Sequence, residues 1–290
     1  MLSDINLFMN ASGCWCSDEV QIKKLYDSEL GAIVTKTCTL LPKDGNPEPT
    51  YYKLDNIHIN SKGLPNKGYY YYKDLYNKFD DSKPFILSVA WEHNKNNTIT
   101  ILKDYDSFVN KYELVELNLS CPNLNHSIPS YNYELLDKIL KIISNLKLEK
   151  LYFSLKLSPY LDHCLCDKII ETININNKNK LIKYIVLSNS IPNCLILKNS
   201  KNVLSNIYGG LSGKFNKFIS LSNVKYFKEK LDKNIKIIGC GGIENIDDVN
   251  DYLNNGADYV QLASCFYNQD INNLNITKIN ELINKYKKNT

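Results

Sequence analysis

The 290-residue sequence contains no arginine, only two methionines and two tryptophans, and no long apolar run. Without arginine, every contact to an anion must come from lysine, side-chain amides, hydroxyls or backbone N–H groups, because the bidentate guanidinium fork is missing. A bilayer span needs about 20 consecutive apolar residues, so an integral membrane protein is excluded. The lysines are scattered and leave a net charge of only +4, without the basic stripe of a nucleic-acid surface. We therefore expect neither a membrane nor a nucleic acid as a partner.

The nine cysteines are an odd number, and residues 1–10 lack the basic segment and extended apolar stretch of a secretory signal. We expect the thiols to be reduced and the protein to be cytoplasmic. Cys14 with Cys16 and Cys164 with Cys166 have Cys-x-Cys spacing, but a tetrahedral metal site would need further ligands from elsewhere. Because cysteine is commonly a small buried hydrophobic residue, we predict no metal site.

Short apolar runs rich in β-branched residues alternate with segments whose apolar residues recur at helical spacing. The runs suit buried parallel strands and cover residues 32–34, 85–89, 114–119, 151–157, 182–187, 235–238 and 259–262. The helical patterns cover residues 133–146, 167–175, 224–231 and 246–254. This alternation predicts an α/β protein, and the length permits one domain over residues 1–290.

Two polar tracts marked by glycine and proline, residues 41–68 and 189–218, are too long for simple turns and are expected to be functional loops. Most polar residues of interest follow directly after the predicted strands. In a (β/α)8 barrel, the carboxyl ends of the strands form the catalytic face. This placement favours a (β/α)8 TIM barrel, with long loops covering the substrate at that face, over a doubly wound sheet.

The hexapeptide Asn118-Leu119-Ser120-Cys121-Pro122-Asn123 follows a predicted strand directly. A cysteine can remove a proton only as the thiolate, and an ordinary pKa of about 8.5 means that it needs help from a cation, a dipole or water. His126 on the same loop is either such a helper or a surface histidine. The alternative is a purely structural role, in which the hexapeptide forms a capped turn that contains a buried cysteine.

Glycines and lysines at other strand ends are candidates for binding an anion or a flat ligand. Gly241 and Gly242 precede a predicted helix, so that bare amides and a helix N-terminus can receive a phosphate, unless they only form a tight turn. Ala263 and Ser264 close the next strand, where phosphate sites of barrels recur. Lys36 and Lys156 lie in or after apolar strands, where an unpaired ammonium is costly. Each therefore has either a ligand or a structural ion pair.

The hexapeptide resembles the catalytic-loop motif of class 1 dihydroorotate dehydrogenases, and other segments are similar to that family's motifs in the same order along the chain. These segments are residues 8–13, 34–37, 44–47, 59–66, 154–160, 188–190, 209–213, 237–242 and 261–264. The resemblance implies a TIM-barrel enzyme of pyrimidine synthesis that uses FMN, with Cys121 as the catalytic base and Lys36 as a second catalytic residue.

The resemblance also implies which residues bind each molecule. FMN would contact Ala11, Ser12, Gly13, Lys36, Thr37, Asn118, Lys156, Ser188, Gly213, Gly241, Gly242, Ala263 and Ser264. Dihydroorotate would contact Lys36, Asn60, Lys62, Gly63, Leu64, Asn118, Asn123, Asn189 and Ser190. One by one, these asparagines are ordinary turn formers. Together, their amides suit the edges of a pyrimidine ring and its carboxylate.

By the same resemblance, Cys121 takes a proton from C5 of dihydroorotate while hydride passes from C6 to N5 of FMN, which yields orotate. The loop of residues 60–66 is most like that of class 1A, whose members are homodimers that reoxidise the flavin with fumarate. The chain departs from the family at the shorter segment 124–130 and at Lys43, Thr50, Lys62, Ser212 and Ala263. These departures keep two alternatives open: a related FMN oxidoreductase with another substrate, and a noncatalytic flavin-binding protein.

Overall fold

The computed structural model describes residues 2, 6–13, 15–79, 82–120, 128–266 and 276–289. Eight parallel strands form one sheet in the order β1-β14-β13-β8-β7-β6-β5-β2, and a parallel bridge between Met9 and Ala32 closes it. The strands are β1 (Phe8–Asn10), β2 (Ile33–Val34), β5 (Phe85–Ala90), β6 (Glu113–Asn118), β7 (Leu151–Lys156), β8 (Ile182–Leu187), β13 (Lys236–Cys240) and β14 (Tyr259–Leu262). The predicted barrel is confirmed, with the short β1 as the strand that the sequence patterns did not predict.

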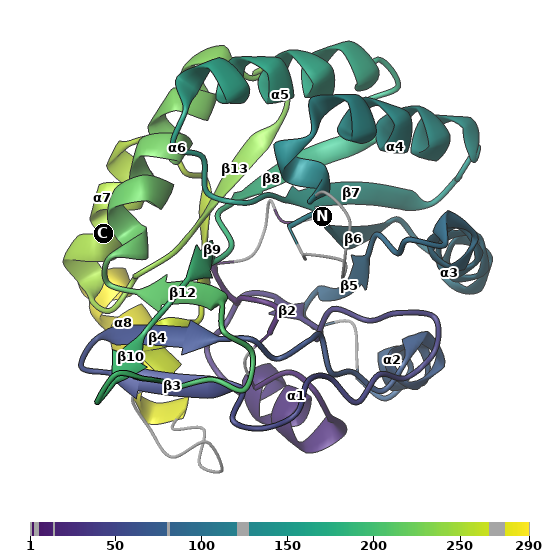
Figure 1. Ribbon diagram of the computed structural model, residues 1–290. Coiled ribbons are helices and arrows are strands. Elements are labelled where there is room, and N and C mark those ends of the chain that lie inside the picture. Colours follow the sequence, from purple (N-terminus) through teal and green to yellow (C-terminus); the bar gives the residue numbers. More distant parts are fainter. Residues whose placement is uncertain are drawn as a thin grey trace.

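One α-helix follows each barrel strand, and Figure 1 shows these helices around the outside of the strands. They are α1 (Glu19–Tyr26), α2 (Tyr69–Tyr76), α3 (Lys95–Phe108), α4 (Tyr133–Asn145), α5 (His163–Asn176), α6 (Asn216–Lys230), α7 (Ile246–Asn254) and α8 (Ile276–Asn289). The helical patterns predicted α4 to α7, although α5 and α6 begin earlier than expected. Among the described residues, no helix is both long and apolar enough to cross a bilayer.

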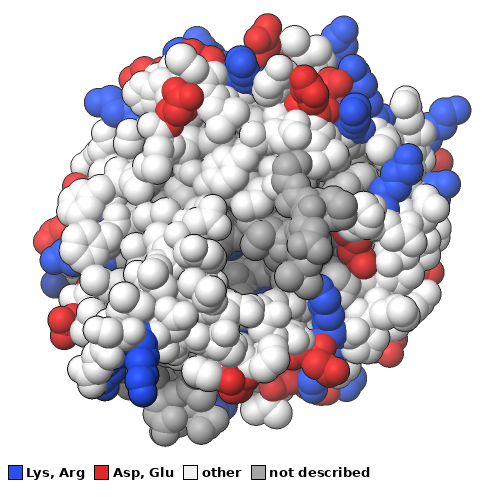
Figure 2. Space-filling model, viewed as in Figure 1, with Lys and Arg blue, Asp and Glu red and all other residues white. Residues whose placement is uncertain are grey.

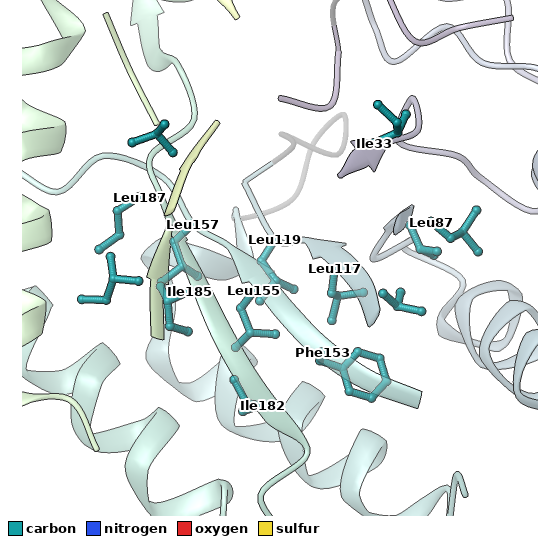
Figure 3. Packing of buried hydrophobic residues seen from close by; sticks show 14 of the residues in the cluster. Ile33, Leu87, Leu117, Leu119, Phe153, Leu155, Leu157, Ile182, Ile185 and Leu187 are labelled. Carbon is teal, nitrogen blue, oxygen red and sulfur yellow. The ribbon is translucent and has the colours of Figure 1, made fainter. Parts of the chain in front are cut away.

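Side chains of the barrel strands alternate between two apolar clusters. Leu117, Phe153 and Ile185, shown in Figure 3, belong to the larger cluster. This cluster also contains buried residues of the helices. Leu114 and Val186 belong to the smaller cluster, which consists almost entirely of strand residues and fills the barrel interior. Successive strand residues point to opposite faces, and here both faces are buried. This is why the strands are apolar without interruption at most positions.

Toward the carboxyl ends of the strands, the barrel interior changes from apolar to polar. On β6, the inward-facing Leu114 is followed on the same face by Glu116 and Asn118. Lys156 ends β7 and Gln261 lies within β14, and all four polar side chains are buried. The polar part of the interior therefore lies at the end of the barrel where catalytic residues of such folds collect.

The two long tracts predicted as loops pair with each other in a four-stranded antiparallel sheet, which lies at the lower left of Figure 1. Its strands are, in spatial order, β3 (Tyr51–Leu54), β4 (Ile57–Asn60), β12 (Gly209–Gly213) and β9 (Ile191–Cys194), while β10 (Leu197–Lys198) and β11 (Lys201–Asn202) form a separate hairpin. The loop prediction is wrong for these segments. Asn60 pairs with Gly210 in the ladder, so hydrogen bonds between tracts distant in sequence determine where Asn60 lies.

Candidate active site

A chain of hydrogen-bonded hydroxyl and amide groups joins the carboxyl ends of β1, β2 and β6. Ser12 Oγ lies 2.8 Å from Thr37 Oγ1, and Asn118 Nδ2 donates to Thr37 Oγ1 at 3.2 Å. The Ser120 hydroxyl and backbone N–H both donate to Asn118 Oδ1, at 2.8 and 3.1 Å. Closure of the barrel thus brings together three of the residues predicted to bind the cofactor.

The same chain continues to the end of β8 and to the antiparallel sheet. Asn189 Nδ2 donates to Ser120 Oγ, and Asn189 Oδ1 accepts from the Ser190 N–H at 2.8 Å. Asn60 Nδ2 donates to Gly210 O at 3.4 Å. A Cβ at Gly210 would collide with Ser190 Oγ, so glycine lets β12 approach this residue closely. Three of the predicted substrate residues therefore lie together.

Lys156 is buried, and Gln261 and Glu116 are among the polar neighbours of its ammonium group inside the barrel. Nζ lies 3.3 Å from Gln261 Oε1 and 4.0 Å from Glu116 Oε1. Gln261 Nε2 donates to Glu116 Oε2 at 2.7 Å, and Ser88 Oγ donates to Glu116 Oε1 at 3.1 Å. The ion pair that the sequence left open for Lys156 is therefore present. A ligand contact remains compatible with it, because an ammonium carries three donors.

Lys36, the predicted second catalytic residue, follows β2 and is 7% exposed. Its backbone N–H donates to Cys16 O at 2.9 Å, and the N–H of Thr35 donates to Ile86 O at 3.0 Å. The second bond continues the pairing of β2 with β5, and the first ties Lys36 to the turn that precedes α1. Lys36 is thereby held next to Thr37, which belongs to the hydrogen-bonded chain.

The turn after β1 lies beside the end of β14. Ala11 N–H donates to Leu262 O at 2.7 Å, and Gly13 N–H donates to Cys16 Sγ at 3.3 Å. Gly13 has φ +127°, a conformation that favours glycine. Ala263 follows β14 directly, and the buried Ser264 begins the 3₁₀ helix η2 (Ser264–Phe266). The first and last predicted cofactor segments are therefore neighbours across the barrel closure.

Three glycines form a tightly packed group at the ends of β12 and β13. Gly242 has φ +61°, and a Cβ there would lie 2.7 Å from Gly213 O. A Cβ at Gly241 would lie 2.6 Å from Ser220 Oγ, and Ser220 Oγ lies 2.6 Å from Ser188 Oγ. The element η2 also packs beside β12. The predicted phosphate residues thus lie close together, and neighbouring protein atoms leave no room for side chains at Gly241 and Gly242.

The N-terminus of α7, which was expected to receive the phosphate, is occupied by side chains of its own first turn. Asn245 Oδ1 accepts from Asp248 N–H at 3.0 Å, and Asp248 Oδ2 accepts from the N–H groups of Glu244 and Asn245 at 2.9 and 3.2 Å. Asp247 adds another carboxylate. These bonds use three of the N–H donors at the start of the helix and the first turn is acidic, and both features disfavour an anion at this position. The glycine turn before it remains a candidate.

Residues 62–64, predicted to bind substrate, are held by a different set of contacts. Lys62 O accepts from Asn46 N–H at 2.9 Å, and Leu64 O accepts from Asn66 Nδ2 at 3.0 Å. Lys62 Nζ lies 5.9 Å from the centroid of the Tyr51 ring. A Cβ at Gly63, which has φ +70°, would lie 2.5 Å from Asn46 Oδ1. These contacts tie the segment to β3 and to the tract after β2, and not to the barrel interior.

Four residues that the sequence singled out lie outside the described residues: Cys14, Cys121, Asn123 and His126. The described chain before this gap ends at Ser120, which is 7% exposed and bonded to Asn118 and Asn189. The residue that precedes Cys121 is thus part of the hydrogen-bonded chain at the carboxyl ends of the strands.

The face viewed in Figure 2 has most of its charged side chains around its margin and mainly uncharged ones near the middle. Inside the barrel, Cys240 ends β13, and burial raises the pKa of its thiol. This thiol therefore stays neutral at neutral pH. Glu116, Lys156 and Lys36 are the buried charged residues at this end of the barrel that the site contains.

Sequence reasoning missed Ser88, Glu116, Ser220 and Gln261 as residues of this site. Glu116 and Gln261 could have been found, because each is a single polar residue between apolar neighbours in a strand pattern that is otherwise apolar. A buried charge or amide at such a position needs a partner. Ser88 and Ser220 carry no such signal, since a buried hydroxyl is common in strands and helices.

Fold and site together define a (β/α)8-barrel enzyme whose polar residues collect at the carboxyl ends of its strands. Comparison with known families then makes this specific. The chain belongs to the dihydroorotate dehydrogenase family, whose sequence model, described as "Dihydroorotate dehydrogenase", matches residues 2–285.

Individual relatives agree with the family assignment and with the resemblance to class 1A. A Streptococcus agalactiae protein is 37% identical over 265 residues, which are 89% of this chain and 83% of the relative. "Dihydroorotate dehydrogenase (fumarate)" of Lachancea kluyveri is 34% identical, with 92% of this chain and 85% of the relative covered. "Dihydroorotate dehydrogenase A (fumarate)" of Lactococcus lactis is 34% identical, with 91% and 85% covered. The crystal structure of DHODH from Eimeria tenella in complex with ferulenol matches with a TM-score of 0.74 at 16% identity. The match covers 96% of this chain and 80% of that chain, which shows that the two share a fold.

Proposed function

We propose that this protein oxidises dihydroorotate to orotate in pyrimidine synthesis and that fumarate reoxidises its flavin. The names of the Lachancea kluyveri and Lactococcus lactis relatives support this substrate and acceptor. The structural observation that carries the proposal is the continuous chain of contacts from Ser12 to Ser190 and Asn60. It joins six segments that resemble separate family motifs at one end of the barrel.

FMN is the cofactor that we propose, and the described residues fit it in two respects. Gly213, Gly241 and Gly242 lie together in tight turns, where an added Cβ would collide with neighbouring protein atoms, and a turn of backbone N–H groups without side chains suits contacts to a phosphate. Hydroxyls, an amide and an ammonium at the strand ends suit the nitrogen and oxygen edge of a flavin ring. When bound, FMN supplies the hydride acceptor.

The proposed tasks of the protein's own residues follow from their chemistry. Lys36 and Lys156 bring positive charge to a buried site, where it favours an anionic substrate and an electron-rich reduced cofactor. The amides of Asn60, Asn118 and Asn189 orient the substrate ring through paired donors and acceptors. Cys121 removes the proton, and the bonds of Ser120 to Asn118 and Asn189 hold the residue before it.

The test is to purify the protein, record its flavin spectrum and add dihydroorotate without oxygen. We expect the yellow absorbance to bleach and then to return when fumarate is added. The Cys121→Ala variant should retain the same flavin content but bleach at least about a hundredfold more slowly, which is the usual contribution of a general base. A yellow protein that dihydroorotate does not bleach would refute the proposal.

The same resemblance leads us to propose that the chain acts as one domain and assembles as a cytoplasmic homodimer. Light scattering after size-exclusion chromatography tests the assembly directly. The expected mass is twice the 33.4 kDa of one chain. A mass of 33.4 kDa at micromolar concentration would contradict the homodimer.

A further inference from the structure

The interior of the barrel contains a buried ion pair that is bridged by an amide. Lys156 Nζ and Glu116 Oε1 are 4.0 Å apart, and the two side chains are 4% and 1% exposed. Gln261 connects them, because its Oε1 lies 3.3 Å from Nζ and its Nε2 donates to Glu116 Oε2 at 2.7 Å. The three residues come from β6, β7 and β14, so the barrel itself holds this arrangement in place.

Glu116 has a partner for each carboxylate oxygen. Ser88 Oγ donates to Oε1 at 3.1 Å, while Gln261 Nε2 donates to Oε2. Both carboxylate oxygens of Glu116 therefore accept a hydrogen bond, one from a hydroxyl and one from an amide. The same Ser88 hydroxyl lies 2.9 Å from Thr37 Oγ1, which connects Glu116 to the hydrogen-bonded chain of the site.

The position of the pair determines which neighbours feel its charge. Lys156 ends β7 and pairs across the sheet with Asn118, the last residue of β6. Glu116 lies one inward-facing position deeper on β6. Coulomb interactions in a protein interior are weakly screened compared with those in water. The field of Lys156 at the strand ends is therefore reduced by the carboxylate just below it.

We propose that Glu116 is a positioning residue: it holds Lys156 and offsets its positive charge, and so sets the reduction potential of a flavin bound at the strand ends to a more negative value. This inference rests on the proposed function in one respect, namely that the flavin contacts Lys156. Positive charge near a flavin ring favours the electron-rich reduced form. Removing the charge of Glu116 therefore makes reduction of the flavin more favourable and its reoxidation by the acceptor less favourable.

The experiment measures the midpoint potential of the flavin in the holoprotein, by reductive titration against reference dyes. Glu116→Gln keeps the size of the side chain but removes its charge, and the expected result is a shift to a more positive potential. Glu171→Gln is the matched control, because Glu171 is exposed on α5, and it should leave the potential unchanged. An unchanged potential in Glu116→Gln would overturn the proposal.

A second set of variants separates action through Lys156 from a general structural effect. In a Lys156→Met background, Glu116→Gln should cause a much smaller shift, because the charge that Glu116 offsets is gone. An equal shift in both backgrounds would overturn the proposal. Glu116→Asp retains the charge but draws it away from Lys156, so it should give a smaller shift in the same direction. This variant keeps the test available if Glu116→Gln does not fold.

The potential requires bound flavin but no dihydroorotate, so the two proposals fail in different ways. A protein that shows the expected shifts but is not bleached by dihydroorotate would keep this inference and refute the proposed substrate. A protein that dihydroorotate bleaches but whose potential does not shift would keep the proposed substrate and refute this inference. A chain that binds no flavin would refute both.

Discussion

Replacing Lys217 tests whether the glycine turn after β13 depends on an ion pair between α6 and α7. Lys217 Nζ contacts Asp248 Oδ1 and lies 2.6 Å from Asp251 Oδ2. Burial opposes its charge, but its hydrogen bonds to the two carboxylates outweigh burial and raise the pKa of Lys217. A Cβ at Gly242 would lie 2.9 Å from Lys217 Cβ, so the side chain of Lys217 also packs against the glycine turn.

The size of the effect follows from the exposure of the three side chains. Lys217 and Asp248 are 14% and 13% exposed, whereas Asp251 is 50% exposed. Removing one partner of a fully buried pair costs about 3 to 5 kcal/mol, and an exposed pair contributes about 0 to 1 kcal/mol. For Lys217→Met we therefore expect a loss of about 2 kcal/mol in the free energy of unfolding, nearly all of it from Asp248.

The assay combines urea unfolding of the protein with titrations of FMN and of riboflavin, which lacks the phosphate. Without Lys217, two carboxylates near the proposed phosphate position lose their counter-charge, and FMN should bind about tenfold more weakly, or about 1.4 kcal/mol. Riboflavin should be affected much less. Adding Asp248→Asn should restore part of both losses, because it removes the uncompensated charge. Equal weakening of FMN and riboflavin, or no recovery in the double variant, would refute this reasoning.

Three further predictions concern buried or strained positions. His58 is 1% exposed, and burial lowers its pKa from the ordinary 6.5 to about 4. Because the imidazole of the unfolded chain therefore takes up a proton at a higher pH than that of the folded chain, the free energy of unfolding should fall by about 3 kcal/mol as the pH drops from 6.5 to 4. Urea unfolding should show a smaller decline for His58→Gln, and an identical one would contradict the assignment. Gly242→Ala should lower the free energy of unfolding by about 2 kcal/mol, since its φ is +61° and the new Cβ would lie 2.7 Å from Gly213 O; an unchanged melting temperature would speak against this. Iodoacetamide should label the exposed Cys164 before the buried Cys166, because burial raises the pKa of Cys166 to about 12. Peptide mass spectrometry can show the order of labelling, and the opposite order would contradict the packing of α5.

Local physical chemistry in the sequence determined most of the barrel elements. The run Val115-Glu116-Leu117 lies in a short apolar segment that suits a strand buried on both faces. The boundaries of α7 agree with its pattern because Asn245 and Asp248 form a capping box at its start. β1 escaped notice, since Phe8–Asn10 has no β-branched residue and ends in the polar Asn10, and its pairing with β14 defines it. Polar residues that follow strands are enough to predict that a site lies at the carboxyl ends.

Only the tertiary structure decided which of these polar groups meet. The pairing of β4 with β12 unites two tracts that look like separate loops, because the register of a ladder depends on backbone partners that no local pattern specifies. The capping of α7 by its own acidic side chains disfavours the phosphate site that its sequence had suggested. The partner of Lys156 was open in the sequence, and closure of the barrel assigns it to Glu116 and Gln261. A buried charge requires a partner, but only the folded chain brings one within reach.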